Sequence, residues 1–276
     1  MFPKKKSITK AYKGTEFSIN SLEKYGLFIL ENVFSKEDLY LLSSFKKLYV
    51  NESKIQQKIL SNTGGYELGN LAMGKCFIHL EIWNMMMKSK AIKETFNLFN
   101  VKKIEDLMQA GGNINFPQSI PQPFHTDSPL KDKYIMVFVA LEKITSNNGA
   151  QEVIFENNIY GNNHIDMLFA RLKNGSSLLN MNAGDILIRY SSTWHRGTKN
   201  SSFVPRPMPV FSISLDSKRL SNNHQININQ FGKKISFLGN VLSEGGKFNR
   251  LHVFLARRFN RIFHIIIYLA KLFKDY

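Results

Sequence analysis

The stretch "PQPFHTDSPLKDKYIMVFVAL", residues 121–141, places a His-x-Asp triplet ahead of an apolar run. The run is rich in β-branched and aromatic residues, which favours a strand. In an extended segment residues i and i+2 face the same side, so His125 and Asp127 can both reach one ion. The same spacing recurs at His164 and Asp166. The triplet therefore has to be interpreted together with its surroundings.

Outward from this triplet, the second half of the chain is a series of short apolar segments separated by clusters of Gly, Asn, Pro and Ser. These segments are "NINF" (113–116), "YIMVFVAL" (134–141), "QEVIF" (151–155), "SLLNM" (177–181), "DILIRYSS" (185–192) and "MPVFSISL" (208–215). Short strands at such spacing are typical of an antiparallel sandwich or jelly roll. The sequence therefore predicts a mainly β fold with flanking helices, in the α+β class.

Helices are predicted on the N-terminal side of these strands. Asn20 and Ser35 are each followed three residues later by an acidic residue, which is the pattern of a helix N-cap with a reciprocal partner. Between them "YGLFILENVF", residues 25–34, predicts a short strand. Residues 50–110 are mixed and mostly helical in pattern.

A third ligand is expected from a later strand that folds back beside the first. The best candidate is His195 in "AGDILIRYSSTWHRGTKNSS", residues 183–202, where it ends the predicted strand and is followed by a glycine turn. Two histidines and one carboxylate on one face of an octahedron leave three positions open, as in non-heme Fe(II) oxygenases. Arg206 begins the next apolar strand, where its guanidinium could bind the carboxylate of a chelating 2-oxo acid bidentately.

Four segments together resemble the phytanoyl-CoA dioxygenase family of Fe(II)- and 2-oxoglutarate-dependent oxygenases. They are "YGLFILENVFSKEDL" (25–39), "PFHTDSP" (123–129), "VALEKITSNNGAQEVI" (139–154) and "AGDILIRYSSTWHRGTKNSS" (183–202). The likeness covers about residues 20–216 and lies in the shared order of the segments. Two positions depart from the family: "FENNIYGNNH" (155–164) replaces a Pro-Gly-Ser-His loop, and Thr126 stands where members often have glutamine.

The resemblance implies a double-stranded β-helix, a cupin-like jelly roll, with Fe(II) held by His125, Asp127 and His195. It implies that Arg206 binds the C5 carboxylate of 2-oxoglutarate, with Gln122 and Thr126 as further candidate contacts. O2 would be the second co-substrate, and succinate and CO2 would be released as an unactivated C–H bond is hydroxylated. Hydroxylation is preferred to halogenation because Asp127 fills the carboxylate position that iron halogenases leave vacant.

Composition and charge limit the cellular compartments and the kinds of partner that are plausible for this chain. The lone Cys76 cannot form an intramolecular disulfide, and "MFPKKKSITKAYKG" (1–14) lacks the apolar core of a secretory signal, so a cytoplasmic location is expected. The net charge is +16. Much of it lies at the two ends, with five lysines in residues 1–13 and seven Lys or Arg in residues 247–276. Terminal basic segments of this kind bind anionic surfaces or serve solubility.

The C-terminal segment "FNRLHVFLARRFNRIFHIIIYLAKLF", residues 248–273, has apolar positions at helical spacing with basic residues on another face. Its longest stretch without Lys, Arg, Asp or Glu is Ile262 to Ala270, far short of the roughly 20 residues that a membrane span needs. Such a helix suits the head-group boundary of an anionic membrane. We therefore expect peripheral association with the inner membrane face and a lipid-linked substrate, or packing on the core or on a second subunit.

These patterns divide the chain into four parts. They are a basic leader (1–19), the oxygenase domain (20–216), a linker (217–246) and a basic amphipathic helix (247–276). The main alternative to an oxygenase is a non-catalytic jelly-roll protein held on membranes by its C-terminal helix. Hydroxylation of nucleic acid is disfavoured because the chain carries no recognisable nucleic-acid motif. The sequence leaves the identity of the small-molecule or lipid-linked substrate and the oligomeric state open.

Overall fold

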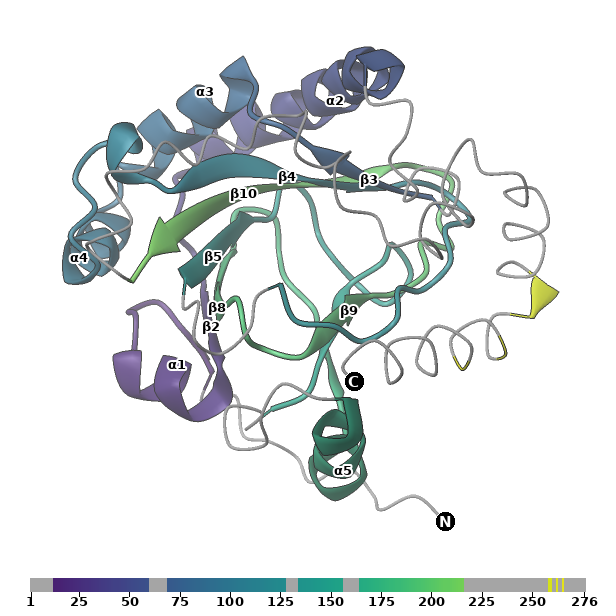
Figure 1. The fold of residues 1–276 in the computed structure, drawn as a ribbon. Coiled ribbons are helices and arrows are strands. Elements are labelled where there is room, and N and C mark those ends of the chain that lie inside the picture. The colour runs from purple at the N-terminus through teal and green to yellow at the C-terminus, as the bar shows by residue number, and fades with distance from the viewer. Residues whose placement is uncertain are drawn as a thin grey trace.

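A computed structural model describes residues 12–59, 69–127, 134–155 and 164–215, together with four single positions near the C-terminus. In these residues the chain has a mixed α+β fold with two β-sheets (Figure 1). Helices lie along the outer side of the larger sheet, and the smaller sheet lies on the opposite side (Figure 1). The expected double-stranded β-helix with flanking helices is confirmed.

The larger sheet has the strand order β1-β2-β8-β5-β10-β4-β3. Its strands are β1 (Lys13–Gly14), β2 (Leu27–Leu30), β8 (Ile186–Tyr190), β5 (Tyr134–Val139), β10 (Arg206–Ser214), β4 (Gln109–Asn115) and β3 (Asn70–Met73). The short β1 runs parallel to β2, and the other neighbours are antiparallel. The order brings strands that are distant in sequence side by side, which is characteristic of a jelly roll.

The smaller sheet has the order β7-β6-β9, and both pairs are antiparallel. Its strands are β7 (Ser177–Leu179), β6 (Gln151–Val153) and β9 (His195–Gly197). An isolated antiparallel bridge joins His125 to His195 at its edge. A buried apolar cluster draws on both sheets: from the larger it takes Leu27, Ile29, Phe138, Leu187, Met208 and Val210, and from the smaller it takes Val153 and Leu179. This cluster fills the barrel lumen between the sheets.

Helices cover the outer face of the larger sheet. They are α2 (Lys36–Ile59), α3 (Phe77–Met86) and α4 (Lys90–Leu98). The described residues also form α1 (Ile19–Tyr25), the 3₁₀ turn Ile104–Asp106 and α5 (His164–Asn174). A second buried cluster joins residues of α2, α3 and α4 to strand residues such as Phe211 and Ile213. The larger sheet is therefore buried on both faces, which stabilises the platform under the lumen.

Alternation along the strands decides which side chains enter the lumen. On β10, Met208 and Val210 belong to the lumen cluster and Phe211 belongs to the helix-side cluster. Because strand residues alternate between faces, Arg206 shares the lumen face with Met208. By the same alternation Arg189 of β8 shares the lumen face with Leu187.

One of the two predicted N-caps is confirmed. Ser35 precedes α2, and its Oγ accepts a hydrogen bond from Asp38 N at 3.1 Å and donates one to Asp38 Oδ2 at 3.0 Å. The N-cap of α1 is Ser18 and not Asn20, because Ser18 has the extended backbone of a cap and its Oγ accepts from Ser21 N at 3.2 Å. Asn20 lies inside the first turn of α1. It had been predicted as the N-cap because an acidic residue follows three positions later.

Strand β4 is longer than its apolar pattern predicted, whereas β10 begins at Arg206 as expected. Strand β4 begins at Gln109, and its glycines had hidden the first half, since glycine has low β-propensity. Strand β10 begins at Arg206 and contains Pro207 and Pro209. Strand β5 pairs with β10 only from Val210 onward, so the prolines lie where β10 has one neighbour and a missing N–H is tolerated.

Much of the two chain ends lies outside the described residues, including the predicted linker (217–246) and nearly all of the predicted C-terminal helix. Residues Lys13–Gly14, which precede the predicted start of the oxygenase domain, pair with β2. At the C-terminal end Phe259, Ile262 and Ile265 are exposed. In the part of the chain that the structure describes, no helix is long and apolar enough to cross a membrane.

Candidate metal centre

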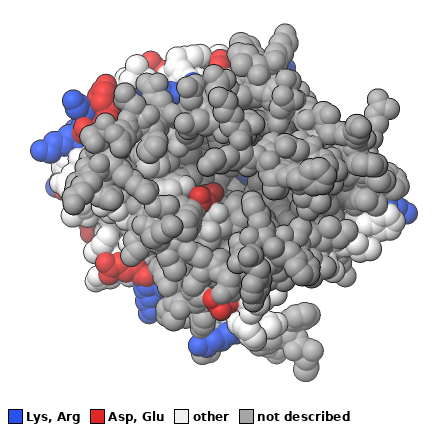
Figure 2. All heavy atoms as spheres, in the orientation of Figure 1, with Lys and Arg blue, Asp and Glu red and all other residues white. Residues whose placement is uncertain are grey.

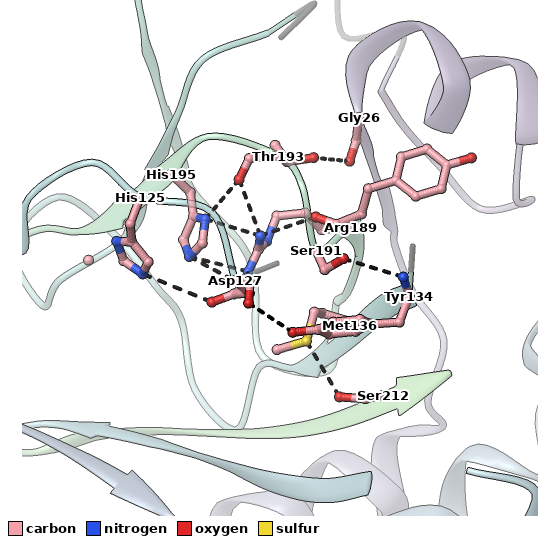
Figure 3. A network of polar contacts seen from close by, with 12 residues as sticks. Gly26, His125, Asp127, Tyr134, Met136, Arg189, Ser191, Thr193, His195 and Ser212 are labelled. Atoms are coloured by element: carbon pink, nitrogen blue, oxygen red, sulfur yellow. Dashed lines mark hydrogen bonds and ion pairs between the residues drawn. The ribbon is translucent and has the colours of Figure 1, made fainter. Parts of the chain in front are cut away.

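Three metal-type side chains meet at one end of the lumen. One ligand atom each of His125, Asp127 and His195 lies within 4.8 Å of the other two, and no other such group occurs among the described residues. Figure 3 shows the two imidazole rings and the carboxylate turned toward one another. The predicted triplet is thus brought together, whereas His164 and Asp166 lie in the first turn of α5.

The backbone holds these three residues in place. The N–H of His125 donates to His195 O at 2.9 Å, and the N–H of His195 returns the bond to His125 O at 3.0 Å. The N–H of Asp127 donates to Ser191 O at 2.8 Å. His195 begins β9 and does not end the preceding strand as predicted, because β8 stops at Tyr190 and a turn intervenes. Two segments distant in sequence therefore present their side chains from one bridge.

Hydrogen bonds assign the tautomer of each histidine. Nδ1 of His125 lies 2.9 Å from Pro123 O, and Nδ1 of His195 lies 2.9 Å from Thr193 O. A carbonyl oxygen only accepts, so each Nδ1 carries a proton, and in the neutral form of each ring the lone pair is on Nε2. The Nε2 atom of His125 lies 4.0 Å from Asp127 Oδ1, and that of His195 lies 3.6 Å from Asp127 Oδ2. Orientation of ligand imidazoles by carbonyl groups is usual at metal sites.

Protonation states favour the same assignment. Burial would raise the pKa of Asp127, but the neighbouring His195 and the guanidinium of Arg189 hold it well below its usual value. Burial, reinforced by the positive charge of Arg189, lowers the pKa of His195 well below its ordinary value. At neutral pH the site therefore offers an ionised carboxylate and a neutral imidazole, the forms in which these groups bind a metal ion. The donor set fits a 2-His-1-carboxylate centre.

Arg206 lies on the lumen face at the start of β10, buried to 2% exposure. Its Nη2 donates to Gly149 O at 2.8 Å, its Nη1 to Asn113 Oδ1 at 3.1 Å and its Nε weakly to Asn148 O at 3.4 Å. These partners are all neutral. Burial lowers the pKa of Arg206 to about 10, so the guanidinium stays charged at neutral pH. A buried cation held by neutral acceptors fits a site for a carboxylate.

The two further candidates flank the metal ligands. Gln122 is tied to β9, since its Oε1 accepts from Gly197 N at 2.9 Å and its backbone N–H donates to Gly197 O at 2.9 Å. Thr126 lies between His125 and Asp127 and is partly buried. Both residues are therefore close in the chain or in space to the metal ligands, and no contact of either with Arg206 is found among the described residues.

The sequence analysis missed Arg189, which lies in direct contact with the site. Its Nη2 donates to Asp127 Oδ2 at 2.6 Å, and its side chain is 1% exposed. The signal was a charged residue inside the otherwise apolar and aromatic run "ILIRY" (186–190). In a strand buried on both faces, such a residue has no route to solvent and needs a partner inside the protein.

Comparison with known proteins supports the fold. No protein-family model matches the sequence, and no curated protein matches it either. Among solved structures, EctD from S. alaskensis with bound Fe is similar, with a TM-score of 0.52 and 12% identity over 71% of this chain and 76% of that one. EctD with 2-oxoglutarate and 5-hydroxyectoine gives 0.50 and 13% over 71% and 75%. The resemblance to oxygenases of the phytanoyl-CoA dioxygenase type is thus confirmed at the level of the fold.

Proposed function

We propose that this chain is an Fe(II)- and 2-oxoglutarate-dependent dioxygenase that hydroxylates an unactivated C–H bond. The proposal rests on one observation. In a jelly-roll lumen, two imidazoles with unprotonated Nε2 atoms and one ionised carboxylate lie within 4.8 Å of one another. Three ligands on one side of an ion leave room for a chelating co-substrate and O2, whereas a closed structural site does not.

The proposed roles follow from the position of each side chain. His125, Asp127 and His195 hold Fe(II), and Arg206 binds the C5 carboxylate of 2-oxoglutarate. Together with O2, the bound iron and 2-oxoglutarate would supply the oxidising chemistry, with release of succinate and CO2. The apolar lumen residues exclude water, which strengthens the attraction between Arg206 and a carboxylate.

Gln122 and Thr126 are proposed as secondary contacts to the co-substrate. The side-chain carbonyl of Gln122 already accepts a hydrogen bond from Gly197 N. Its side-chain NH₂ group is therefore the part proposed to donate to the co-substrate. Thr126 offers a hydroxyl between two metal ligands. Neither contact is as strong as a bidentate arginine–carboxylate pair, so both would adjust the position of the co-substrate more than its affinity.

Hydroxylation is the favoured outcome among the reactions open to such a centre. Asp127 supplies the carboxylate ligand, so no coordination position is left for a halide in its place. The substrate is proposed to be a small molecule or a lipid-linked one.

The direct test is an anaerobic titration of the purified chain with Fe(II) and 2-oxoglutarate. We expect one Fe(II) per chain and a weak visible charge-transfer band when the 2-oxoglutarate chelate forms. After admission of air, candidate substrates are screened for succinate release that matches 2-oxoglutarate consumption. A chain that binds neither Fe(II) nor 2-oxoglutarate would favour the alternative of a non-catalytic jelly-roll protein.

Peripheral membrane association is proposed as the setting of the reaction. At the C-terminal end Phe259, Ile262 and Ile265 are exposed apolar residues at helical spacing, and Arg258 beside them is also exposed. Apolar stripes of this kind with basic neighbours suit the head-group boundary. Nucleic acid is not proposed as the substrate, because the sequence carries no recognisable nucleic-acid motif. On the face in Figure 2, described Lys and Arg side chains lie close to Asp and Glu side chains.

Liposome flotation tests the membrane setting. At low salt, vesicles that contain anionic lipid are expected to carry the full-length chain, and a chain truncated after Gly246 is expected to stay in solution. Each basic side chain near an anionic leaflet contributes about 1 kcal/mol, and salt screens that attraction. Neutral vesicles are the control. If the full-length chain does not float, or if the truncated chain does not fold, the C-terminal segment serves the core or a subunit interface.

A further inference from the structure

Arg189 is a buried cation in the lumen, next to the candidate metal centre. It extends from β8, between Ile188 of the helix-side cluster and Tyr190. Its guanidinium lies over the ring of Phe138, 5.1 Å from the centroid. Figure 3 shows it beside His195 and Asp127. Burial of a charge in this environment is costly unless an anion compensates it.

The anion that compensates Arg189 is the same carboxylate that would bind the metal ion. Nη2 of Arg189 donates to Asp127 Oδ2 at 2.6 Å and lies 3.3 Å from Nε2 of His195, which can accept. Nη1 lies 3.1 Å from Nδ1 of His195, but that nitrogen carries a proton, so Nη1 donates instead to Tyr190 O at 3.2 Å. The Nε of Arg189 is buried and has no hydrogen-bond partner among the described residues.

Arg189 therefore shares two ligand atoms with any metal ion in the centre. A divalent ion on Asp127 and His195 takes over most of the negative charge that now faces the guanidinium. Because both are cations, each lowers the affinity of the centre for the other. Arg189 keeps an unpartnered Nε–H and is left with less anionic charge around it.

A charge count of the loaded centre gives the same result. Arg189, Arg206 and a divalent ion carry four positive charges, whereas Asp127 and a 2-oxoglutarate dianion carry three negative ones. Glu142, whose charge also acts on Arg206, is already paired with Lys46 at 2.7 Å. One positive charge is left in a lumen lined by apolar side chains, and a second anion would offset it.

We propose that Arg189 is a second anion-binding residue, and that it takes an anionic group of the primary substrate, such as a carboxylate, phosphate or sulfate. The inference rests on the proposed function and deepens it by naming the substrate class. A guanidinium beside the metal, with a free Nε–H, binds such a group through charge-assisted hydrogen bonds. Arg189 thereby selects anionic substrates and places them next to the metal centre.

Sulfate binding to the loaded protein tests this proposal without turnover. The full-length chain is saturated with Mn(II) and 2-oxoglutarate and titrated with sodium sulfate, with sodium chloride at equal ionic strength as the reference. Fluorescence of Trp194, which is 1% exposed and adjoins His195, reports binding. We expect a saturable response in the wild-type chain that is absent in Arg189→Met. Arg189→Met should also bind Mn(II) about tenfold more tightly or better, since a competing cation is gone.

Arg196→Met is the matched control. Arg196 is also paired with a carboxylate at 2.6 Å and also lies over an aromatic ring, at 4.8 Å from the centroid of Phe124, but its partner Glu152 lies on β6 outside the triad. Its sulfate affinity should equal that of the wild-type chain. Arg189→Lys keeps the charge without the planar fork and should bind sulfate roughly tenfold more weakly.

Two results would overturn the proposal. One is a loaded wild-type chain that shows no saturable sulfate response, or a response of equal affinity in Arg189→Met or Arg189→Lys. The other is weaker Mn(II) binding in Arg189→Met, which would assign Arg189 to the positioning of Asp127 alone. Failure of the wild-type chain to bind Mn(II) or 2-oxoglutarate at all is a different result, and it contradicts the proposed function itself.

Discussion

Replacement of Asp127 by alanine is expected to abolish Fe(II) binding and, with it, the charge-transfer band of the 2-oxoglutarate complex. Asp127 supplies the carboxylate of the triad and lies 4.0 Å and 3.6 Å from the Nε2 atoms of its two histidine partners. Loss of a residue that only supports a ligand typically costs 10- to 100-fold in metal affinity, so loss of a ligand should cost at least about 100-fold. His125→Ala and His195→Ala should give the same result. Anaerobic titration followed by visible absorbance measures all three.

The stability of the Asp127 variants has to be measured beside metal binding. Asp127→Ala leaves Arg189 buried without its carboxylate, and breaking such a pair costs about 3 to 5 kcal/mol. Asp127→Asn keeps the volume and an acceptor for Arg189 while removing the charge, so it should fold better and still bind Fe(II) poorly. Urea unfolding of the variants gives the free energy of unfolding.

The second His-x-Asp triplet in the chain supplies the control. His164→Ala and Asp166→Ala change the same residue types at the same spacing, but both positions lie in the first turn of α5. Neither substitution should alter the band. If His164→Ala removes the band and His125→Ala leaves it, the metal centre has been assigned to the wrong triplet.

Replacement of Arg206 by methionine is expected to weaken 2-oxoglutarate binding strongly while Fe(II) binding stays nearly intact. The guanidinium is 2% exposed and its partners are neutral, so a carboxylate would be its first anionic partner in hydrogen-bond contact. Removal of one member of a buried charge-assisted pair costs about 2 to 5 kcal/mol, or about 30-fold to several thousand-fold in affinity. The band intensity as a function of 2-oxoglutarate concentration gives the dissociation constant.

Arg171 offers a control for the removal of an arginine. It is exposed on α5 and contacts the ring of Phe124. Arg171→Met should therefore leave the 2-oxoglutarate affinity unchanged. An Arg206→Met chain that binds 2-oxoglutarate as the wild type does would remove this arginine from the co-substrate site and leave Arg189 as the candidate.

Local patterns in the sequence predicted many of the strands. The segments at 134–141, 151–155, 177–181 and 185–192 all contain strands of the structure, because alternation and β-branched content are properties of neighbouring residues. The same locality explains the errors. Glycine obscured the first half of β4, where pairing with the neighbouring strand overrides propensity. Asn20 and Ser18 are both residue types that cap helices, but Ser18 is the residue with the extended backbone conformation of an N-cap.

The sequence by itself determined which residues could bind a metal ion and a carboxylate, since His125, Asp127, His195 and Arg206 were identified by residue type, order and spacing. Tertiary structure alone decided that they converge, because the bridge between His125 and His195 joins segments that are distant in the sequence. It also decided the role open to Arg189. Alternation places that side chain on one face of β8, but only the smaller sheet, packed across the lumen, makes that face an interior where a charge must find an anion.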